Sequence, residues 1–365
     1  MKIIHCSDLH IESPIIGLPL EKSKIRKEEI LRTFEKMCDY AEQNDVSVVL
    51  ICGDMFDNVK PTSKCINRVF SAIEKCNSVK FLYLAGNHDQ QLFTSIQNVP
   101  NNFIIFNEKW NYYTFNNVVI AGAELKNNNF KLLSQSLALD ENKFNIVALH
   151  GEVVGYNSDE KAEIISIPSL KNKNIDYLAL GHYHTYSEGQ IDLRGKYAYS
   201  GCLDSRGFDE LNDKGFVLIE IDEDKILSDS VKKYTSNFVK FSSRNFYLFD
   251  FDLTGEQNFY ESVDKLLSTL QNQFSPESLL KIVLTGEVSL DFDIDINLIT
   301  NRLNEKFFFA KVYDKTTLKV DLNDYQFDKS VKGEFVRAIL SSDISNEQKQ
   351  KILTLGIKAL NGEEI

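Results

Sequence analysis

The 365-residue sequence contains no long hydrophobic run. No apolar stretch approaches the roughly 20 residues that a helix needs to cross a bilayer. The first ten residues, MKIIHCSDLH, hold at most three apolar residues before His5, too few for the apolar core of a secretion signal. These absences predict a protein that stays in the cytoplasm and has no membrane association.

The sequence also lacks any Cys-x-x-Cys pair. Its six cysteines lie at positions 6, 38, 52, 65, 76 and 202. Without a secretion signal, this scatter favours reduced, mostly buried thiols over a disulfide framework, and a zinc ribbon has no support.

Positive charge is in short supply. The chain has 41 Lys and Arg against 53 Asp and Glu, a net charge of −12 that is spread over both halves. Nucleic-acid binders normally gather Lys and Arg against phosphates. Any such activity here must therefore draw on bound metal cations, a local basic patch or a partner protein. The composition is otherwise that of a globular protein, and at roughly 150 residues per domain the length predicts two or three domains.

Short β-rich runs alternate with helical patterns in the first part of the chain. Apolar residues recur at helical spacing in Glu21–Asn44 and again in Thr62–Cys76. This alternation predicts a layered α/β domain with a mostly parallel or mixed sheet, covered on both faces. The predicted strands are Lys2–Cys6, Val46–Cys52, Val79–Ala85, Phe103–Phe106, Val118–Ala121, Ile146–Leu149, Tyr177–Leu180 and Phe216–Ile221.

After about residue 240 the pattern changes, and neither His nor Cys occurs again. The order β-α-β-α-β predicts a compact second domain, which we do not expect to hold a metal. Its predicted elements are strand Asn245–Phe251, helix Phe259–Phe274, strand Leu279–Thr285, helix Asn297–Leu303 and strand Phe307–Tyr313. We place the domains at 1–240, 241–322 and 323–365.

The last segment, 323–365, predicts two short helices. Ser345 and Gln348 form a capping-box pattern before Lys349–Leu360. Ile352, Leu355 and Ala359 make one apolar stripe. The stripe either packs on its own chain or docks another protein, and the sequence leaves both alternatives open.

Five short polar signatures follow five of the predicted strands. Ligand sites of α/β sheets form at the carboxyl ends of strands, so neighbouring loops would gather these side chains in one cleft. All six histidines, at 5, 10, 88, 150, 182 and 184, lie in the same part of the chain. The signatures are Asp8-Leu9-His10, Gly53-Asp54-Met55-Phe56-Asp57, Gly86-Asn87-His88-Asp89, His150-Gly151 and Gly181-His182-Tyr183-His184.

The side chains in these signatures predict a metal site. Asp, Asn and His offer oxygen and nitrogen ligands that suit manganese, iron or zinc. An aspartate between two cations bridges them at roughly 3.5–4 Å, which activates water and clamps a phosphoryl group. Singly, each signature also fits an ordinary turn, and His150 alone fits a buried core residue. Gly86 and Gly181 are expected to let the backbone turn sharply as it leaves its strand.

The order of these motifs resembles the calcineurin-like metallophosphoesterases over residues 1–220. The resemblance implies a four-layer αββα sandwich with a dinuclear metal centre, here followed by a small α+β cap domain and C-terminal helices. It implies that His88 stabilises or protonates the leaving oxygen and that Asp89 orients His88. It assigns Asp8, His10, Asp54 and His184 to one metal, and Asp54, Asn87, His150 and His182 to the other, with Asp54 bridging.

Two further segments resemble the SbcD and YhaO type of DNA repair exonucleases within that family. They are the run from His5 to Pro14 with Gly17-Leu18, and Tyr199–Cys202 with Arg206, Glu210 and Lys214-Gly215-Phe216. One departure is Ile11-Glu12, where relatives more often have Leu-Asp or Leu-Gly; it touches no expected ligand. The resemblance implies a nuclease domain at 1–240, DNA as substrate, an SbcC-like ATPase partner and a homodimer.

We therefore expect a metal-dependent DNA exonuclease or endonuclease that acts in DNA end processing and repair. It would use two divalent metal ions, with manganese (Mn2+) first and iron or zinc as alternatives. One alternative function is a phosphoesterase for small phosphodiesters, nucleotides or phosphoprotein, which the acidic charge favours and the second domain disfavours. Another is a non-catalytic scaffold, which the full set of candidate ligands disfavours.

Overall fold

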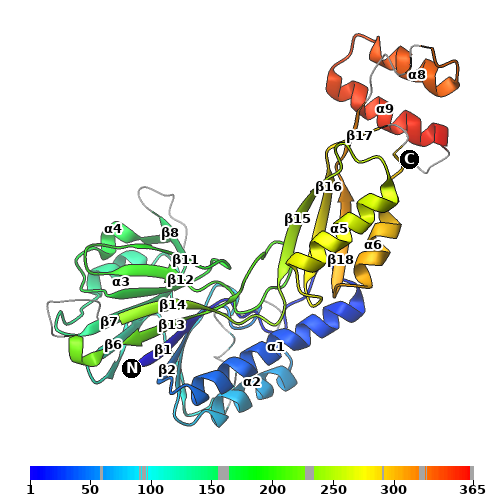
Figure 1. Ribbon diagram of the computed structural model, residues 1–365. Coiled ribbons are helices and arrows are strands. Elements are labelled where there is room, and N and C mark those ends of the chain that lie inside the picture. Colours follow the sequence, from blue (N-terminus) through cyan, green and yellow to red (C-terminus); the bar gives the residue numbers. More distant parts are fainter. Residues whose placement is uncertain are drawn as a thin grey trace. The chain divides into compact units, whose positions relative to one another are not determined.

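A computed structural model of the chain (Figure 1) describes residues 1–57, 61–89, 92, 96, 98–154, 164–226, 234–289, 292–319, 325 and 327–361. It divides into two compact units, Met1–Asn245 and Phe246–Ile365. Among the described residues, no helix has both the length and the apolar character that crossing a bilayer requires.

The first sheet of the first unit has a parallel centre. Its order is β14-β13-β1-β2-β3-β4, in which β1 to β4 run parallel and the other two strands extend the β1 edge antiparallel. Every residue of β2 is buried, as expected for a strand covered on both faces. The strands are β1 (Lys2–Cys6), β2 (Val48–Cys52), β3 (Lys80–Leu84), β4 (Phe103–Ile105), β13 (Gly215–Ile221) and β14 (Tyr234–Lys240).

The second sheet repeats this design with antiparallel strands at both edges. Its order is β11-β12-β10-β7-β6-β5, with β12, β10, β7 and β6 parallel. A separate two-stranded ladder joins β8 (Glu152–Val154) to β9 (Ile164–Ser166). The six strands are β5 (Asn111–Phe115), β6 (Val118–Gly122), β7 (Phe144–His150), β10 (Tyr177–Gly181), β11 (Ser187–Gln190) and β12 (Lys196–Tyr199).

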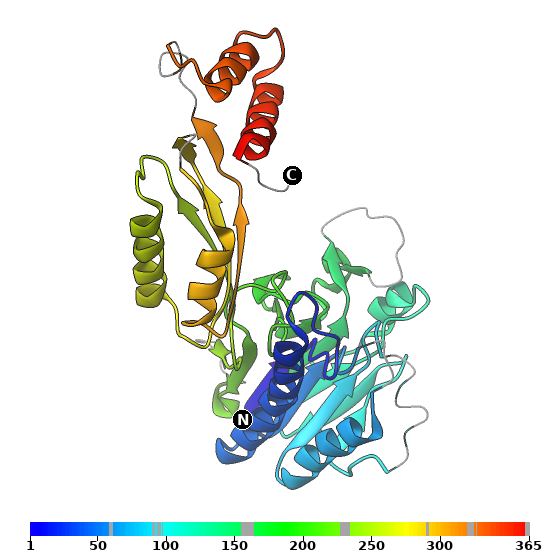
Figure 2. The ribbon, with the colours of Figure 1, turned by 90° about the vertical axis from the view of Figure 1, so that its right-hand side faces the viewer.

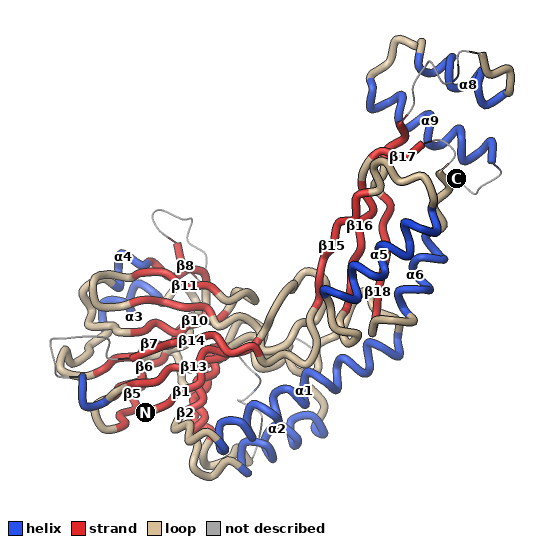
Figure 3. Tube along the Cα trace, viewed as in Figure 1, coloured by secondary structure: helices blue, strands red, loops and turns tan. Residues whose placement is uncertain are grey.

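Helices cover the outer faces of the two sheets (Figures 2 and 3). Helices α1 (Leu20–Gln43) and α2 (Ser63–Lys75) pack on the first sheet, and α3 (Phe130–Ser136) and α4 (Ile167–Leu170) on the second. Alternate residues of β2 divide between two cores: Val49 contacts the helices, whereas Leu50 faces the second sheet. The layer order is α-β-β-α, so the predicted four-layer sandwich is confirmed.

The second unit has a parallel sheet in the order β15-β16-β18. Helices α5 and α6 share one apolar core with it and cover the same face (Figure 1). Helices α8 (Val331–Leu340) and α9 (Asn346–Asn361) pack together through a smaller core. The remaining elements are β15 (Phe246–Asp252), α5 (Phe259–Gln273), β16 (Leu279–Thr285), α6 (Ile296–Asn304), β18 (Phe309–Asp314), and the paired β17 (Glu287–Ser289) and β19 (Thr317–Lys319).

The sequence pattern located most buried strands but missed the short or polar ones, among them β5, β11 and β14. Strand β14 is half-exposed along its length, so its apolar content is too low to stand out.

All six cysteines are buried and form no disulfide.

Candidate metal centre

The five signatures meet at one edge of the two sheets. Asp8, Asp54 and Asn87 follow the carboxyl ends of β1, β2 and β3, whereas His150 ends β7 and His182 follows β10. Parallel pairing places these ends next to one another within each sheet, and the two sheets lie face to face. The cleft expected from the strand pattern is therefore formed by loops from both sheets.

The backbone is unusual at several of these positions. Asp8, His10, Asp54 and His182 have φ values of 51°, 43°, 50° and 111°, in the region that L-residues rarely adopt. Such conformations cost free energy and persist where the surrounding structure imposes them, often at functional sites. Four strained residues in one small cluster indicate that the loops are built to present these side chains.

Glycines before the signatures leave room for the candidate ligands. A Cβ on Gly86 would lie 2.1 Å from Asp54 Oδ1, and one on Gly181 would lie 1.8 Å from the carbonyl oxygen of Cys52. Neither glycine is among the residues with positive φ. Neither position therefore depends on positive φ; glycine is needed here because the backbone approaches other atoms so closely.

One half of the centre gathers Asp8, His10 and His184, whose ligand atoms lie within 4.8 Å of one another. The Nε2 atoms of His10 and His184 are 3.2 Å apart, and His184 Nε2 is 3.6 Å from Asp8 Oδ1. His10 Nε2 also lies 3.9 Å from Asp54 Oδ2.

The other half gathers Asp8, Asp54 and His150, again within 4.8 Å. His150 Nε2 lies 3.5 Å from Asp54 Oδ2 and 3.0 Å from Asn87 Oδ1. Asp54 approaches imidazoles of both halves, which is the position that a bridging carboxylate needs.

His182 is placed beside this second half rather than within it. Its backbone N–H donates to the Asp8 carboxylate at 3.1–3.2 Å, and its ring centroid is 5.5 Å from that of His150. Among the described residues it belongs to none of the groups of converging ligand atoms. Its role as a ligand stays a prediction.

In two of the candidate ligands, His150 and His184, the Nδ1 atom that faces away from the centre has a hydrogen-bond partner. His150 Nδ1 lies 2.9 Å from the Cys52 carbonyl oxygen, and His184 Nδ1 lies 2.7 Å from Glu210 Oε1. A proton on Nδ1, donated to these acceptors, leaves the Nε2 lone pair directed at the centre. His5, by contrast, is a core residue bonded to Tyr177 and the Leu180 carbonyl, and its burial lowers its pKa to about 4.

Two carboxylates share this buried space with few compensating charges. Burial raises the pKa of Asp54, and the neighbouring Asp8 adds to the rise. Burial acts on Asp8 as well, but His150, His184 and the Ser7 hydroxyl outweigh it, so that the pKa of Asp8 is lowered. Burial would lower the pKa of His150, yet Asp54 and Asp8 raise it. The centre is therefore electrostatically suited to cations.

The donor set fits divalent metal ions. It combines carboxylate oxygens, an amide oxygen and imidazole nitrogens, which are ligands of intermediate hardness. His10 directs its Nε2 at His184 and Asp54, while its buried Nδ1, without a hydrogen-bond partner among the described residues, lies 4.0 Å from Asp57 Oδ1. Several acceptor atoms face one another here, and a bound cation would satisfy them together.

His88 is 35% exposed and belongs to a third group, with His10 and Asp57, whose ligand atoms lie within 4.8 Å of one another. Its Nδ1 is 2.8 Å from Asp57 Oδ1. The expectation that Asp89 orients His88 is wrong: the Asp89 carboxylate accepts from the backbone N–H groups of Phe56 and Gly86. Asp89 is buried beneath the loop and fixes the backbone, whereas Asp57, three residues after Asp54, contacts the imidazole.

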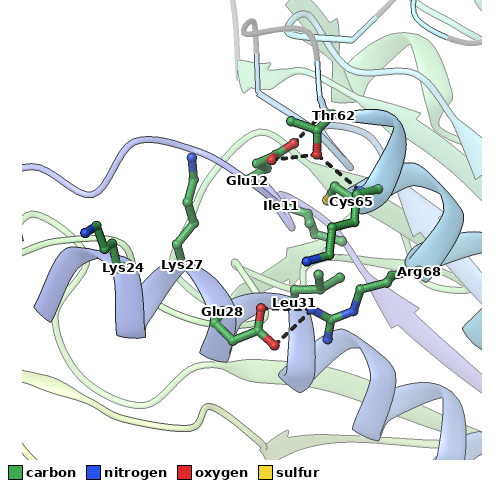
Figure 4. Close-up of a pocket in the computed structure, with 10 residues that line it drawn as sticks. Ile11, Glu12, Lys24, Lys27, Glu28, Leu31, Thr62, Cys65 and Arg68 are labelled. Carbon is green, nitrogen blue, oxygen red and sulfur yellow. Dashed lines mark hydrogen bonds and ion pairs between the residues drawn. The ribbon is translucent and has the colours of Figure 1, made fainter. Parts of the chain in front are cut away.

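The departure at Ile11-Glu12 has a structural role. Glu12 accepts hydrogen bonds from the Thr62 backbone N–H at 2.6 Å and its hydroxyl at 2.9 Å, immediately before α2 (Figure 4). The pocket drawn there has a volume of about 240 Å³, and Lys24, Lys27 and Lys64 contribute to its lining. It therefore brings cationic side chains next to the loop that carries Asp8 and His10.

Comparison with known proteins places these features among phosphoesterases. A family model described as "Calcineurin-like phosphoesterase" matches residues 1–186. The SbcD component of the SbcCD nuclease of Staphylococcus epidermidis is 23% identical over 63% of this chain and 68% of its own length. "DNA double-strand break repair protein Mre11" of Sulfurisphaera tokodaii is 25% identical over 90% and 84%. "Uncharacterized metallophosphoesterase YhaO" of Bacillus subtilis is 25% identical over 60% and 57%.

Proposed function

The chain belongs to the calcineurin-like phosphoesterase family, and from that premise we propose that it is a dinuclear-metal phosphodiesterase that cuts DNA. A member of this family is a hydrolase that uses divalent metal ions. The observation that carries the proposal is the convergence of two carboxylates, Asp8 and Asp54, with three imidazole Nε2 atoms at the strand ends.

We assign each candidate ligand to one of two cations. Asp8, His10, Asp54 and His184 would hold one, and Asp54, Asn87, His150 and His182 the other. Two divalent cations bound there would supply positive charge for the phosphate oxygens and acidify a water molecule. Manganese is the first choice of metal, with iron and zinc as alternatives.

His88 would handle the proton of the leaving oxygen. It is 35% exposed, accessible enough to meet a substrate, and its ligand atom converges with those of His10 and Asp57 rather than with those of Asp8 and Asp54. With Nδ1 facing Asp57 Oδ1 at 2.8 Å, its Nε2 is the ring nitrogen available to the sugar oxygen. A phosphodiester needs such help because its alkoxide leaving group is a poor one.

DNA is proposed as the substrate because two of the similar proteins are named as part of a nuclease and as a double-strand break repair protein. Lys24, Lys27 and Lys64 offer local positive charge on a chain whose net charge is −12. We further propose that residues 241–322 form a cap over the DNA and that residues 323–365 dock an SbcC-like ATPase partner. We also propose that the protein forms a homodimer and is located in the cytoplasm.

A second candidate is hydrolysis of small phosphodiesters, nucleotides or phosphoprotein by the same centre. The acidic net charge favours it, because long-range repulsion hinders binding to a polyanion. It requires neither the basic pocket nor the second unit.

The deciding experiment incubates the full chain with Mn2+ and a linear duplex labelled at one end. A parallel reaction contains bis-p-nitrophenyl phosphate, a small chromogenic diester. His88→Ala is the matched control, since it lies outside the ligand set and should retain the metal. Mn2+-dependent shortening of the duplex that the control lacks supports a nuclease.

Cleavage of the small diester with intact DNA would favour the second candidate. Repeating the DNA reaction with an SbcC-type ATPase and ATP then tests whether delivery by a partner is required. Loss of both activities in His88→Ala with Mn2+ still bound supports its assigned role, whereas retained hydrolysis contradicts it.

A further inference from the structure

A charged segment after β12 (Lys196–Tyr199), seen in the sequence as Arg206, Glu210 and Lys214, surrounds His184. Glu210 is buried and contacts His184 Nδ1, and the buried Lys214 ammonium donates to the His184 carbonyl oxygen at 2.8 Å. Arg206 is the third member, with its side chain 20% exposed. The role of this segment is not explained by ligand binding alone, since none of the three is a candidate ligand.

Arg206 holds Glu210 in place through several bonds to its carboxylate. Its Nη2 and Nε donate to Glu210 Oε1 at 2.7 and 3.0 Å, and its backbone N–H donates to Oε2 at 2.7 Å. A forked guanidinium–carboxylate pair of this kind fixes both position and orientation. Glu210 therefore cannot rotate away from His184 without breaking the pair.

The other end of the same guanidinium reaches toward His88. Arg206 Nη1 is 3.7 Å from Asp57 Oδ2 and 3.4 Å from Ser13 Oγ, and that hydroxyl donates to Asp57 Oδ2 at 2.7 Å. The opposite oxygen of Asp57 contacts His88 Nδ1 at 2.8 Å. A continuous chain of contacts thus joins His184, Glu210, Arg206, Asp57 and His88.

We propose that Arg206 is a positioning residue that fixes two imidazoles at once, His184 through Glu210 and His88 through Asp57. The inference rests on the proposed phosphodiesterase function, but not on DNA as its substrate. The Arg206 guanidinium lies between the carboxylates of Glu210 and Asp57. It thereby links the candidate ligand His184 to His88, the residue proposed to serve the leaving group. Loss of Arg206 should therefore weaken metal binding and lower turnover together.

The test compares Arg206→Met, Arg206→Lys and Glu210→Gln in the full chain, with Arg32→Met as control. Arg32 is an exposed arginine that pairs with Glu28 on α1, outside the centre. Mn2+ affinity is measured by isothermal titration calorimetry. The kcat and KM for hydrolysis of bis-p-nitrophenyl phosphate are measured at saturating Mn2+.

Glu210→Gln should weaken Mn2+ binding by roughly 10- to 100-fold, the range typical of partners behind a metal ligand. Arg206→Met should weaken Mn2+ binding similarly and also lower kcat by at least about tenfold, with little change in KM. Arg32→Met should match the parent in both. Arg206→Lys keeps the charge but not the fork, so both losses should be partly restored.

Two results would overturn the proposal. One is Arg206→Met behaving like Arg32→Met; the other is Arg206→Met losing only metal affinity, with kcat at saturating Mn2+ equal to that of the parent. If Arg206→Met does not fold, Arg206→Lys decides, because parental values of both affinity and kcat would exclude the role. None of these readouts uses DNA, so failure of DNA cleavage would leave the test intact.

Discussion

At the scale of single residues, the centre depends on positions where no side chain fits. The Cβ of an alanine at position 86 would meet Asp54 Oδ1 at 2.1 Å and the Asp54 backbone nitrogen at 2.6 Å. Since Asp54 is itself in a strained left-handed conformation, it has little freedom to yield. A change at Gly86 should therefore be transmitted directly to the proposed bridging carboxylate.

We predict that Gly86→Ala weakens Mn2+ binding at least about tenfold and destabilises the fold by ~1–3 kcal/mol through overpacking. Calorimetric titration and urea unfolding measure the two effects. Gly255→Ala is the control: position 255 has φ of 83° but open space around its Cβ, so it should cost stability alone. Unchanged Mn2+ affinity in Gly86→Ala would show that Asp54 can move without loss of binding.

A second residue-scale prediction concerns a buried acid away from the ligands. Burial raises the pKa of Glu124 to about 7 against its usual 4.5, and its carboxyl group accepts from the Ala85 backbone N–H. The folded state thus binds this proton more tightly than the unfolded state does. Stability from Glu124 is complete below about pH 4.5 and falls as the pH rises toward 7.

Glu124→Gln keeps an acceptor for Ala85 but carries no charge. Relative to the parent, it should gain about 1–3 kcal/mol of unfolding free energy at pH 8 and much less at pH 5. Urea unfolding of both proteins at the two pH values measures this, because other titrating groups are common to both. An equal difference at pH 5 and pH 8 would contradict the assignment.

At the scale of elements, the sequence predicted those features of helices that depend on residues close together in the chain. The capping box before α9 is confirmed: the Ser345 N–H donates to Gln348 Oε1 at 3.1 Å, and the Gln348 N–H to Ser345 Oγ at 3.2 Å. The predicted apolar stripe of Ile352, Leu355 and Ala359 is not the face that packs on α8, since Ile352 and Leu355 are 38% and 51% exposed. Among the side chains of α9 that the structure describes, Leu353 and Ile357 are buried, packed against Val336 of α8.

Helix α9 consequently has two apolar faces, and only one of them is covered within the helical pair. Ile352 and Leu355 are 38% and 51% exposed. If this segment docks an ATPase partner, Ile352→Ser with Leu355→Ser should weaken the association at least about tenfold and leave hydrolysis of the small diester unchanged. Surface plasmon resonance with an SbcC-type ATPase measures the first effect.

Leu353→Ser is the comparison for that prediction. It removes a fully buried side chain and should loosen the α8–α9 pair, which circular dichroism would register as lost helix. If the double variant Ile352→Ser with Leu355→Ser binds the ATPase as the parent does, α9 packs only on its own chain. Binding lost in Leu353→Ser alone would show that the fold of the pair matters, but not its exposed face.

At the scale of the whole molecule, the sequence could predict the layers and the strand ends because both follow from local pattern and parallel topology. It could not predict that Asp57 rather than Asp89 contacts His88, since Asp89 is next to His88 in the sequence and Asp57 lies in a different signature. Which of two nearby acids turns toward an imidazole depends on the surrounding backbone N–H groups: the Asp89 carboxylate accepts from Gly86 of its own loop and from Phe56 of the loop after β2. The same limit applies to Arg206, whose partners lie up to 193 residues away.

Metal binding should also distinguish the two units. Every candidate ligand lies within Met1–Asn245, and no His or Cys occurs beyond residue 202. A cation that binds only the folded state stabilises by about 2.7 kcal/mol at a concentration 100 times its Kd. It also relieves the crowding of Asp8 and Asp54, so the strands that end at the centre should open less often.

We therefore predict that Mn2+ slows backbone amide exchange in β1, β2 and β7, while exchange in β15 and β16 stays the same. Hydrogen–deuterium exchange followed by mass spectrometry, with and without Mn2+, measures both in one sample of the full chain. Asp54→Asn is the control, because it removes the proposed bridging charge and should abolish the slowing. Slowed exchange in β15 and β16 as well would mean that the units unfold together, whereas slowing that persists in Asp54→Asn would place the Mn2+ outside this centre.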